Sequence, residues 1–307
     1  MPMIYFLPDK KTVDSAEGET LLQTSLRANI PHANVCGGAG RCSTCRVNVL
    51  EGLEHCSPRT ADEQAIATML HFPPGVRLAC QTVPTGTVKV RRLVEDLEDI
   101  DFQTLFIEGM EAVTIGEEKS VLILFADIQG FTSFAENLLP FDVIYALNLH
   151  LRQMGAIIKD HGGHIDNYMG DGFMALFEAE VPEAGALQAV QAGLEMLQTV
   201  EQLGPYLEEL YHRTFRMRIG LHYGKVVAGK LGHPGHKKLT VIGDAVNMAS
   251  RIENANKKAG TWFLISEDTY ALVKDQVQVG KRPYLNLRGK SGKYRLYEVT
   301  GLKLGGT

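Results

Sequence analysis

The chain has 307 residues, of which 45% are hydrophobic and 22% charged, so it can form a large core, and its length favours two domains. This composition excludes a disordered chain, a collagen-like repeat and a small disulfide-stapled protein. The longest apolar runs, such as VLILFADI, reach about eight residues, whereas a helix that crosses a bilayer needs ~20. The N-terminus lacks the basic and apolar regions of a signal peptide, so we expect a soluble, cytoplasmic protein without membrane contact.

The net charge of −5 is concentrated in one short segment. Residues 1–90 carry eight basic and eight acidic side chains, residues 91–118 carry two and nine, and residues 119–307 carry 21 and 19. No basic stripe or aromatic platform is present, so a nucleic-acid partner is not expected. The acidity thus marks a short connecting segment between two domains, and we expect a domain over 1–92, an acidic linker over 93–118 and a second domain over 119–303.

Four of the five cysteines predict a metal or redox centre. An odd number of cysteines without a signal peptide argues against disulfides. Cys36, Cys42 and Cys45 lie in CGGAGRCSTC with the spacing C-x5-C-x2-C, and Cys80 follows after 34 further residues. Four thiolates suffice for one [2Fe–2S] cluster, and the three glycines of the loop permit the positive φ angles that wrapping a cluster requires.

Short alternating stretches around the cysteine loop predict a small sheet, with strands at MIYFL, RVNVL and GTVKV. Together with the cysteine spacing they make residues 1–92 resemble the [2Fe–2S] ferredoxin domain, in its adrenodoxin-type and bacterial variants. The resemblance implies a β-grasp-like fold and a [2Fe–2S] cluster held by the four cysteines. A structural zinc site is the alternative, although zinc ribbons prefer two C-x2-C pairs and one is present here. Cys56 matches no ligand position and is predicted to be a buried free thiol.

The acidic segment 93–118 has two interpretations. Leu93, Leu97, Ile100 and Ile107 would share one face of a helix, which favours a short parallel helix pair joining two protomers. The segment spans only about two heptads, whereas a coiled coil needs three or four. A solvated acidic linker is the alternative.

The second domain opens with an apolar strand and a helix. VLILFADI ends in Asp127 and Ile128 and leads into a helical pattern. A long helix is predicted from Phe134 to about Asp160. Its apolar face is formed by Ile144, Leu147, Leu151, Met154 and Ile158.

The next segment, HIDNYMGDGFMALF, predicts a hairpin that presents Asp171 at its turn. If these strands neighbour the first strand, Asp127 and Asp171 converge. Two carboxylates beside backbone carbonyls suit magnesium or manganese together with nucleotide phosphates. Taken alone, Asp171 would be an ordinary turn residue.

The remainder of the domain predicts further strands and helices. An amphipathic helix is expected over about 183–201, and RMRIGLHYGKVVAGKLG predicts two short strands about a glycine turn. KKLTVIGDAVNMASRIENANKKAG predicts a strand that passes into a helix, with Asp244 as N-cap or first-turn acid. Asn247 and Arg251 lie four residues apart on this helix, so they share a face suited to a sugar and a phosphate oxygen. Arg251 alone would be a solvated residue.

Four motifs in this order, FADIQGFT, YMGDGFMALF, GLHYGKVVAG and VIGDAVNMASRIE, resemble the catalytic domain of class III nucleotidyl cyclases. The resemblance implies a ferredoxin-like α/β domain, which makes the whole chain α+β. It also implies a head-to-tail homodimer with two sites at the interface. The implied enzyme is an adenylate cyclase that converts ATP to 3′,5′-cyclic AMP and pyrophosphate.

The same resemblance assigns the metal site and the phosphate contacts. Asp127, Asp171 and the backbone carbonyl of Ile128 would hold two magnesium or manganese ions, which activate the ribose 3′-hydroxyl and neutralise the triphosphate. The partner chain would supply Asn247 on the ribose and Arg251 on the α-phosphate. A late basic residue would bind the β- and γ-phosphates; its position matches Arg288, with Lys290 as the alternative.

The positions that read the purine are Asn167 and Thr240. Adenylyl cyclases usually have Lys at the first and Asp or Thr at the second, whereas guanylyl cyclases have Glu and Cys. Thr240 fits a bacterial adenylyl pattern, but Asn167 fits neither the adenylyl nor the guanylyl pattern. Its amide can donate to adenine N1 or accept from guanine N1–H. We expect ATP as the substrate, with a guanylate or dual-specificity cyclase as the alternative.

A ferredoxin domain joined to a cyclase predicts a signalling enzyme regulated by the redox state or integrity of the cluster. A redox partner, or a small oxidant such as oxygen or nitric oxide, would change the cluster and thereby the turnover. In a second interpretation the protein is an electron-transfer ferredoxin with a cyclase-like docking module. Against this interpretation, the site residues are all intact, namely Asp127, Asp171, Asn247 and Arg251. In a third, the cluster is purely structural.

Overall fold

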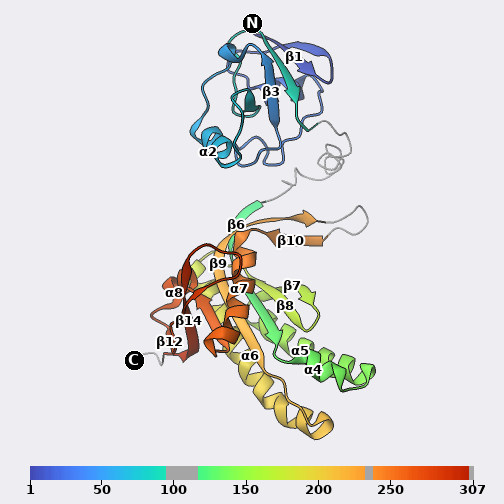
Figure 1. Ribbon diagram of the computed structural model, residues 1–307, viewed down its shortest axis with the longest axis vertical. Coiled ribbons are helices and arrows are strands. Elements are labelled where there is room, and N and C mark those ends of the chain that lie inside the picture. Colours follow the sequence, from blue (N-terminus) through green and yellow to red (C-terminus); the bar gives the residue numbers. More distant parts are fainter. Residues whose placement is uncertain (95–116, 232–237, 304–307) are drawn as a thin grey trace. The chain divides into compact units, whose positions relative to one another are not determined.

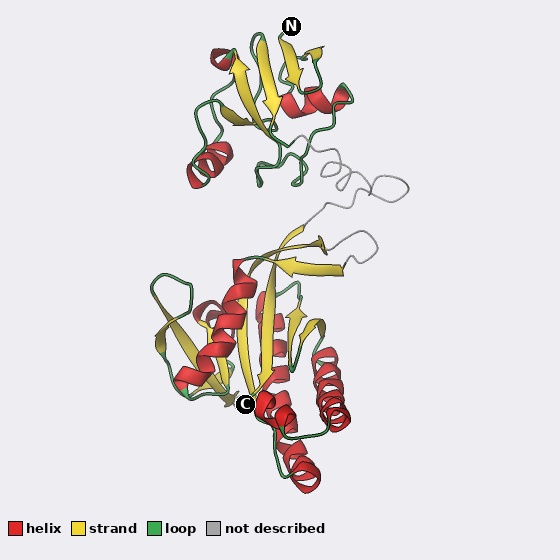
Figure 2. Ribbon diagram, turned by 45° about the vertical axis from the view of Figure 1, so that its right-hand side comes forward, coloured by secondary structure: helices red, strands yellow, loops and turns green. Residues whose placement is uncertain are grey.

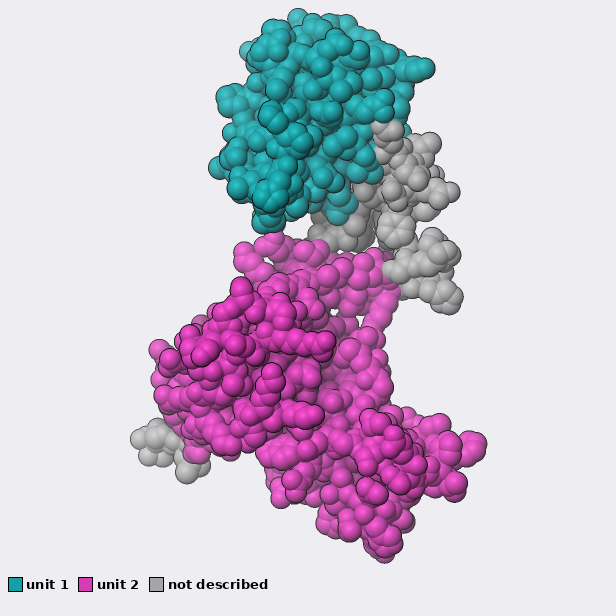
Figure 3. All heavy atoms as spheres, in the orientation of Figure 1, with its two compact units in different colours: residues 1–117 teal, residues 118–307 magenta. Residues whose placement is uncertain are grey.

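The computed structural model describes residues 1–94, 117–231 and 238–303, and the chain divides into two compact units, Met1–Glu117 and Glu118–Thr307 (Figure 3). Each unit is built around its own buried apolar residues. The predicted linker helix, with Leu97, Ile100 and Ile107, lies outside the described residues. Among the helices that the structure describes, none is long and apolar enough to span a membrane.

The N-terminal unit is a five-stranded sheet in the order β2-β1-β5-β3-β4. Figure 1 labels two of these strands, β1 and β3, and the helix α2. The three predicted strands are confirmed as β1, β3 and β5, whereas β2 and β4 are too short to show an alternating pattern in the sequence. The elements are β1 (Met3–Leu7), β2 (Lys11–Asp14), α1 (Leu21–Arg27), β3 (Arg46–Glu51), the 3₁₀ turn η1 (Leu53–His55), α2 (Ala61–Met69), β4 (Val76–Leu78) and β5 (Val88–Arg92).

The C-terminal unit is a larger sheet in the order β12-β14-β11-β9-β6-β8-β7, with β10 paired to β9 and β13 to β14. Its elements are β6 (Glu117–Ile128), α4 (Phe131–Glu136), α5 (Pro140–Asp160), β7 (Gly163–Met169), β8 (Gly172–Phe177), α6 (Pro182–Tyr211), β9 (Met217–Leu231), β10 (Lys238–Ile242), α7 (Asp244–Ala259), β11 (Phe263–Ser266), α8 (Glu267–Val273), β12 (Val277–Val279), β13 (Tyr284–Asn286) and β14 (Lys293–Leu302).

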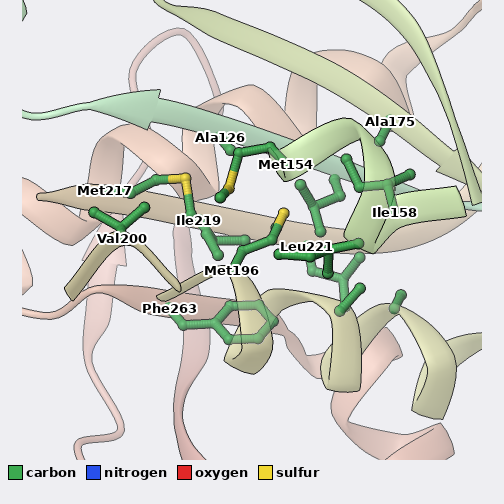
Figure 4. Close-up of a cluster of buried hydrophobic side chains, with 14 of the residues drawn as sticks. Ala126, Met154, Ile158, Ala175, Met196, Val200, Met217, Ile219, Leu221 and Phe263 are labelled. Carbon is green, nitrogen blue, oxygen red and sulfur yellow. The ribbon is translucent and has the colours of Figure 1, made fainter. Parts of the chain in front are cut away.

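Helices cover both faces of this sheet (Figure 2). Along β6, Leu122 and Leu124 pack on one side with residues of α5 and α6, and Val121 and Ile123 pack on the other with residues of α7. Successive side chains of a strand point to opposite faces, so this strand is apolar on both. Figure 4 shows the core on the side of α5 and α6, where Met154 and Met196 pack against residues of β9.

Two helix predictions need correction. The helix expected from Phe134 to Asp160 is two helices, α4 and α5, separated at residues 137–139. The break is explained by Pro140, because the residue before a proline is disfavoured in the helical region and Leu139 is extended. On α5, Met154 and Ile158 are buried as predicted, but Ile144 is exposed. The helix expected to end near residue 201 continues as α6 to Tyr211.

The two strands predicted about a glycine turn in residues 216–232 are one strand, β9, of 15 residues. Gly224 makes no turn. A Cβ atom there would lie 2.7 Å from the Cβ of Ala245, so the glycine allows α7 to approach the strand closely. Asp244 is a first-turn acid of α7, as predicted, and Gly243 is the N-cap.

Gly220 gives a testable measure of this close packing. A Cβ atom at Gly220 would overlap the backbone nitrogen of Glu253 on α7, so we expect Gly220→Ala to destabilise the C-terminal unit by about 3 kcal/mol. Gly204, inside α6, is the matched control, because a Cβ there meets Thr214 at an ordinary 3.6 Å. Gly204→Ala should stabilise the unit by about 0.5–1 kcal/mol. Urea unfolding of the full chain measures both changes, and equal midpoints for the two variants would contradict the packing.

Candidate functional site

The four predicted cluster cysteines lie together in the N-terminal unit, as two pairs. The Cys45 and Cys80 sulfurs are 3.5 Å apart, and the Cys36 and Cys42 thiols are also hydrogen-bonded to each other. In the part of the chain that the structure describes, no three Cys, His, Asp or Glu residues surround a single metal position. Two pairs of thiols suit the two irons of a [2Fe–2S] cluster better than one tetrahedral zinc.

The loop backbone around the thiols supplies hydrogen-bond donors. Three of its glycines have φ angles between 64° and 86°, a region that other residues rarely adopt. The backbone amides of Gly38, Ala39 and Arg41 donate to the Cys36 sulfur, and that of Gly40 donates to Cys80. The hydrogen bond from the Cys45 thiol lowers the pKa of Cys80 to about 6. Donors aimed at sulfur stabilise an anionic thiolate cluster, so the residues fit the group.

Cys56 lies outside this loop in the sequence. Its sulfur lies 3.9 Å from the carbonyl oxygen of Gly52, and burial raises the pKa of its thiol. The thiol is free, as predicted, but only half-buried.

In the C-terminal unit, the predicted acidic pair converges. Asp127 lies near the end of β6, and Asp171 lies at the turn between β7 and β8; because Ala126 pairs with Phe173, the turn comes next to Asp127. Burial, and then the Asp171 carboxylate, raise the pKa of Asp127 to about 6. A divalent cation would relieve this crowding of two carboxylates, so the donor set fits magnesium or manganese.

Gly172 makes this approach possible. A Cβ atom there would lie 3.0 Å from Oδ1 of Asp127 and 2.8 Å from the carbonyl oxygen of Ala126. Ile128, the third predicted metal ligand through its backbone carbonyl, ends β6 with its side chain buried in the core.

Two charged residues near the acidic pair were missed by sequence reasoning. Glu253 on α7 is buried, and burial, followed by the charge of Asp127, raises its pKa to about 7. The positive charge of Arg218 on β9 acts in the opposite direction and lowers the pKa of both Asp127 and Glu253. The helical spacing of Ala249, Glu253 and Asn256 is a signal that could have placed Glu253 on the buried face.

Basic side chains line a cavity of about 530 Å³ between α7 and the segment after β13. Arg251 and Arg288 both line it, with Lys257 and Lys258. Lys290, the alternative to Arg288, instead forms an ion pair with Asp244, which lowers the pKa of that carboxyl. Asn247 is exposed on α7, one turn before Arg251.

The predicted purine-reading residues also belong to one cluster. Asn167 lies on β7 and Thr240 on β10, and they are linked through hydrogen bonds to Lys238 and Asp166. The family resemblance pairs Asn167 with Thr240, but no local pattern predicts the hydrogen bonds through Lys238 and Asp166, since the two segments are about 70 residues apart.

Comparison with known proteins gives both units relatives. Residues 113–301 match the adenylate and guanylate cyclase catalytic domain, and residues 4–85 match the 2Fe-2S iron-sulfur cluster binding domain. An adenylate cyclase of Anabaena cylindrica is 34% identical over 201 residues, which cover 62% of this chain and 39% of that protein. The chain thus spans much less than two thirds of the length of the curated relatives it matches first.

Solved structures are similar to the C-terminal unit. The adenylyl cyclase CyaB from P. aeruginosa is 29% identical, with a TM-score of 0.57, over 62% of this chain and 99% of that one. The guanylyl cyclase Cya2 is 32% identical, also with a TM-score of 0.57, over 61% of this chain and 95% of that one. The α+β fold expected from the sequence is confirmed.

Proposed function

The chain belongs to the family of adenylate and guanylate cyclase catalytic domains, and we propose that it is an adenylate cyclase that converts ATP to 3′,5′-cyclic AMP and pyrophosphate. The observation that carries the proposal is the crowding of Asp127 and Asp171 beside Gly172, at the end of a central strand. Two carboxylates held this close repel each other and destabilise the apoprotein, so the stability of the fold does not explain why they lie together.

Each side chain then has a role in the reaction. Asp127 and Asp171, with the Ile128 carbonyl, would hold two divalent ions. When bound, such ions activate the ribose 3′-hydroxyl and neutralise phosphate charge. Arg251 would stabilise charge on the α-phosphate as the 3′-oxygen attacks it and pyrophosphate leaves, and Arg288 would bind the β- and γ-phosphates. The cavity that Arg251 and Arg288 share supports these two roles.

The proposed active form is a head-to-tail homodimer. The partner chain supplies Asn247, which orients the ribose, and also Arg251. Each of the two sites therefore contains residues of both protomers. A closed dimer of this kind repeats the same interface twice, which makes the two sites equivalent.

The N-terminal unit is proposed to regulate the cyclase through its cluster, held by Cys36, Cys42, Cys45 and Cys80. The presence of a cluster-binding domain and a cyclase domain in one chain supports this. Reduction would add one electron and alter the charge and hydrogen bonding of the loop. Anaerobic assay of the oxidised and reduced holoprotein should give different rates; equal rates would leave the cluster a structural role.

The activity is tested with the purified full chain, ATP and manganese. We expect cyclic AMP and pyrophosphate to form in equal amounts, and a chelator to abolish both until metal is restored. Inorganic phosphate and ADP in place of these products would instead indicate an ATPase and contradict the proposal.

A further inference from the structure

We propose that Lys238 and Asp166 fix the hydrogen-bonding direction of the purine-reading pair, Asn167 and Thr240, so that the pair is complementary to adenine and not to guanine. The inference rests on the proposed function and assigns its purine preference to residues outside the reading pair. It explains how a chain with Asn167, whose amide has both a donor and an acceptor, selects one base.

Lys238 sets the direction of the Asn167 amide. Its Nζ lies 3.0 Å from Oδ1 of Asn167 and also donates to the backbone carbonyl of Asp166. A lysine ammonium has only donors, so the amide must turn its oxygen toward it. The NH₂ group of Asn167 is then left to donate to a ligand.

Asp166 sets the direction of the Thr240 hydroxyl. The hydroxyl donates to Oδ2 of Asp166 at 2.7 Å, and the Asp166 side chain is 4% exposed and 3.7 Å from the Lys238 ammonium. An ionised carboxylate only accepts, so the hydroxyl hydrogen is committed to it. The lone pairs of Thr240 remain to accept from a ligand.

A bulge in β7 puts these groups in reach of each other. The register with β8 shifts between Ile165 and Asn167, so Asp166 has no partner residue on β8. A bulge of this kind redirects side chains and frees backbone groups, here the carbonyl that receives Lys238. Beside the network lies a cavity of about 230 Å³, lined by Asp166, Lys238 and Thr240 among others.

The resulting pattern is one donor and one acceptor. Adenine presents an acceptor at N1 and a donor at its 6-amino group, so it can receive from Asn167 and give to Thr240. Guanine presents N1–H and O6, the reverse pattern. It would place donor against donor and acceptor against acceptor, which costs the desolvation of unpaired groups.

The test is competition between ATP and GTP for the full chain with manganese. Lys238→Met removes the ammonium but keeps most of the length, and we expect the ratio of kcat/KM for ATP over GTP to fall by ~10-fold or more. Asp166→Asn should lower the ratio too, because its amide can donate to Thr240 and free the hydroxyl hydrogen for O6 of guanine. Lys159→Met, at the exposed end of α5, is the control and should leave the ratio unchanged.

A second readout separates this inference from the proposed function. Displacement of a fluorescent ATP analogue by ATP or GTP measures the affinity for each nucleotide without turnover. Lys238→Met should reduce the difference between the affinities for ATP and GTP. An unchanged ratio in both assays, with cyclic AMP still formed, overturns the inference and leaves the function standing. Absence of any cyclic nucleotide from the wild-type chain overturns the proposed function and, with it, this inference. If Lys238→Met lowers the rate equally for ATP and GTP, Lys238 has a merely structural role, and the inference is overturned.

Discussion

Co-expression of two inactive variants, Asp127→Asn and Arg251→Ala, is expected to restore about a quarter of the wild-type rate of ATP cyclisation. Alone, each variant should lose activity ~10²–10³-fold or more, since each removes a group that stabilises charge in the transition state. In the proposed homodimer, Asp127 and Arg251 of one site come from different chains. With random pairing, about half of the dimers are mixed, and each mixed dimer has one of its two sites intact.

Two controls make the mixing experiment specific. A mixture of Asp127→Asn with Asp171→Asn should stay inactive, because these carboxylates meet within one chain and no pairing restores both. Asp160→Asn, at the exposed end of α5, should keep the wild-type rate. Two tags isolate the mixed dimer, whose rate should be about half that of the wild type. An inactive mixed dimer of Asp127→Asn with Arg251→Ala would show that each site is built within a single chain.

Replacing one cluster cysteine is expected to remove the iron. Cys42→Ser should reduce the iron content from about two per chain toward zero and abolish the visible absorption, because the cluster needs all four thiolates. Loss of the bound group should also lower the melting temperature of the N-terminal unit. Metal analysis and absorption spectra of protein purified without oxygen measure these changes.

Cys56→Ser is the matched control for the cluster. Cys56 matches no ligand position, and its half-buried sulfur contacts the Gly52 carbonyl oxygen, so its replacement should leave about two irons per chain. One zinc per chain in the wild-type protein would favour the alternative of a structural zinc site. Full iron content in Cys42→Ser would remove that residue from the ligand set.

Local patterns predicted the parts of the fold in which a short motif determines the geometry. The hairpin around Asp171 and the strand that ends near Asp127 could be read directly, because an Asp-Gly turn between apolar runs allows few other arrangements. The cysteine loop could be read from spacing and glycine content. The break before Pro140 was not predicted, because the apolar positions keep a helical spacing across it, whereas the proline disfavours a helical conformation at Leu139.

Features that depend on tertiary contact could not be read in this way. Gly224 looks like a turn residue, but it accommodates α7 packed against β9. Glu253 looks like a solvated helix residue, yet it is buried near Asp127. Lys238 reaches Asn167 only because β10 folds back along β9, and no local pattern reports a contact between residues so far apart in sequence.

Adenylate cyclase activity is tested most directly by a single reaction of the purified holoprotein with equal concentrations of ATP and GTP in the presence of manganese. Cyclic AMP and cyclic GMP are separated and counted from the same tube, so that one preparation serves for both substrates. We expect cyclic AMP in clear excess. Cyclic GMP in equal or greater amount, or no cyclic nucleotide from either substrate, would contradict this expectation.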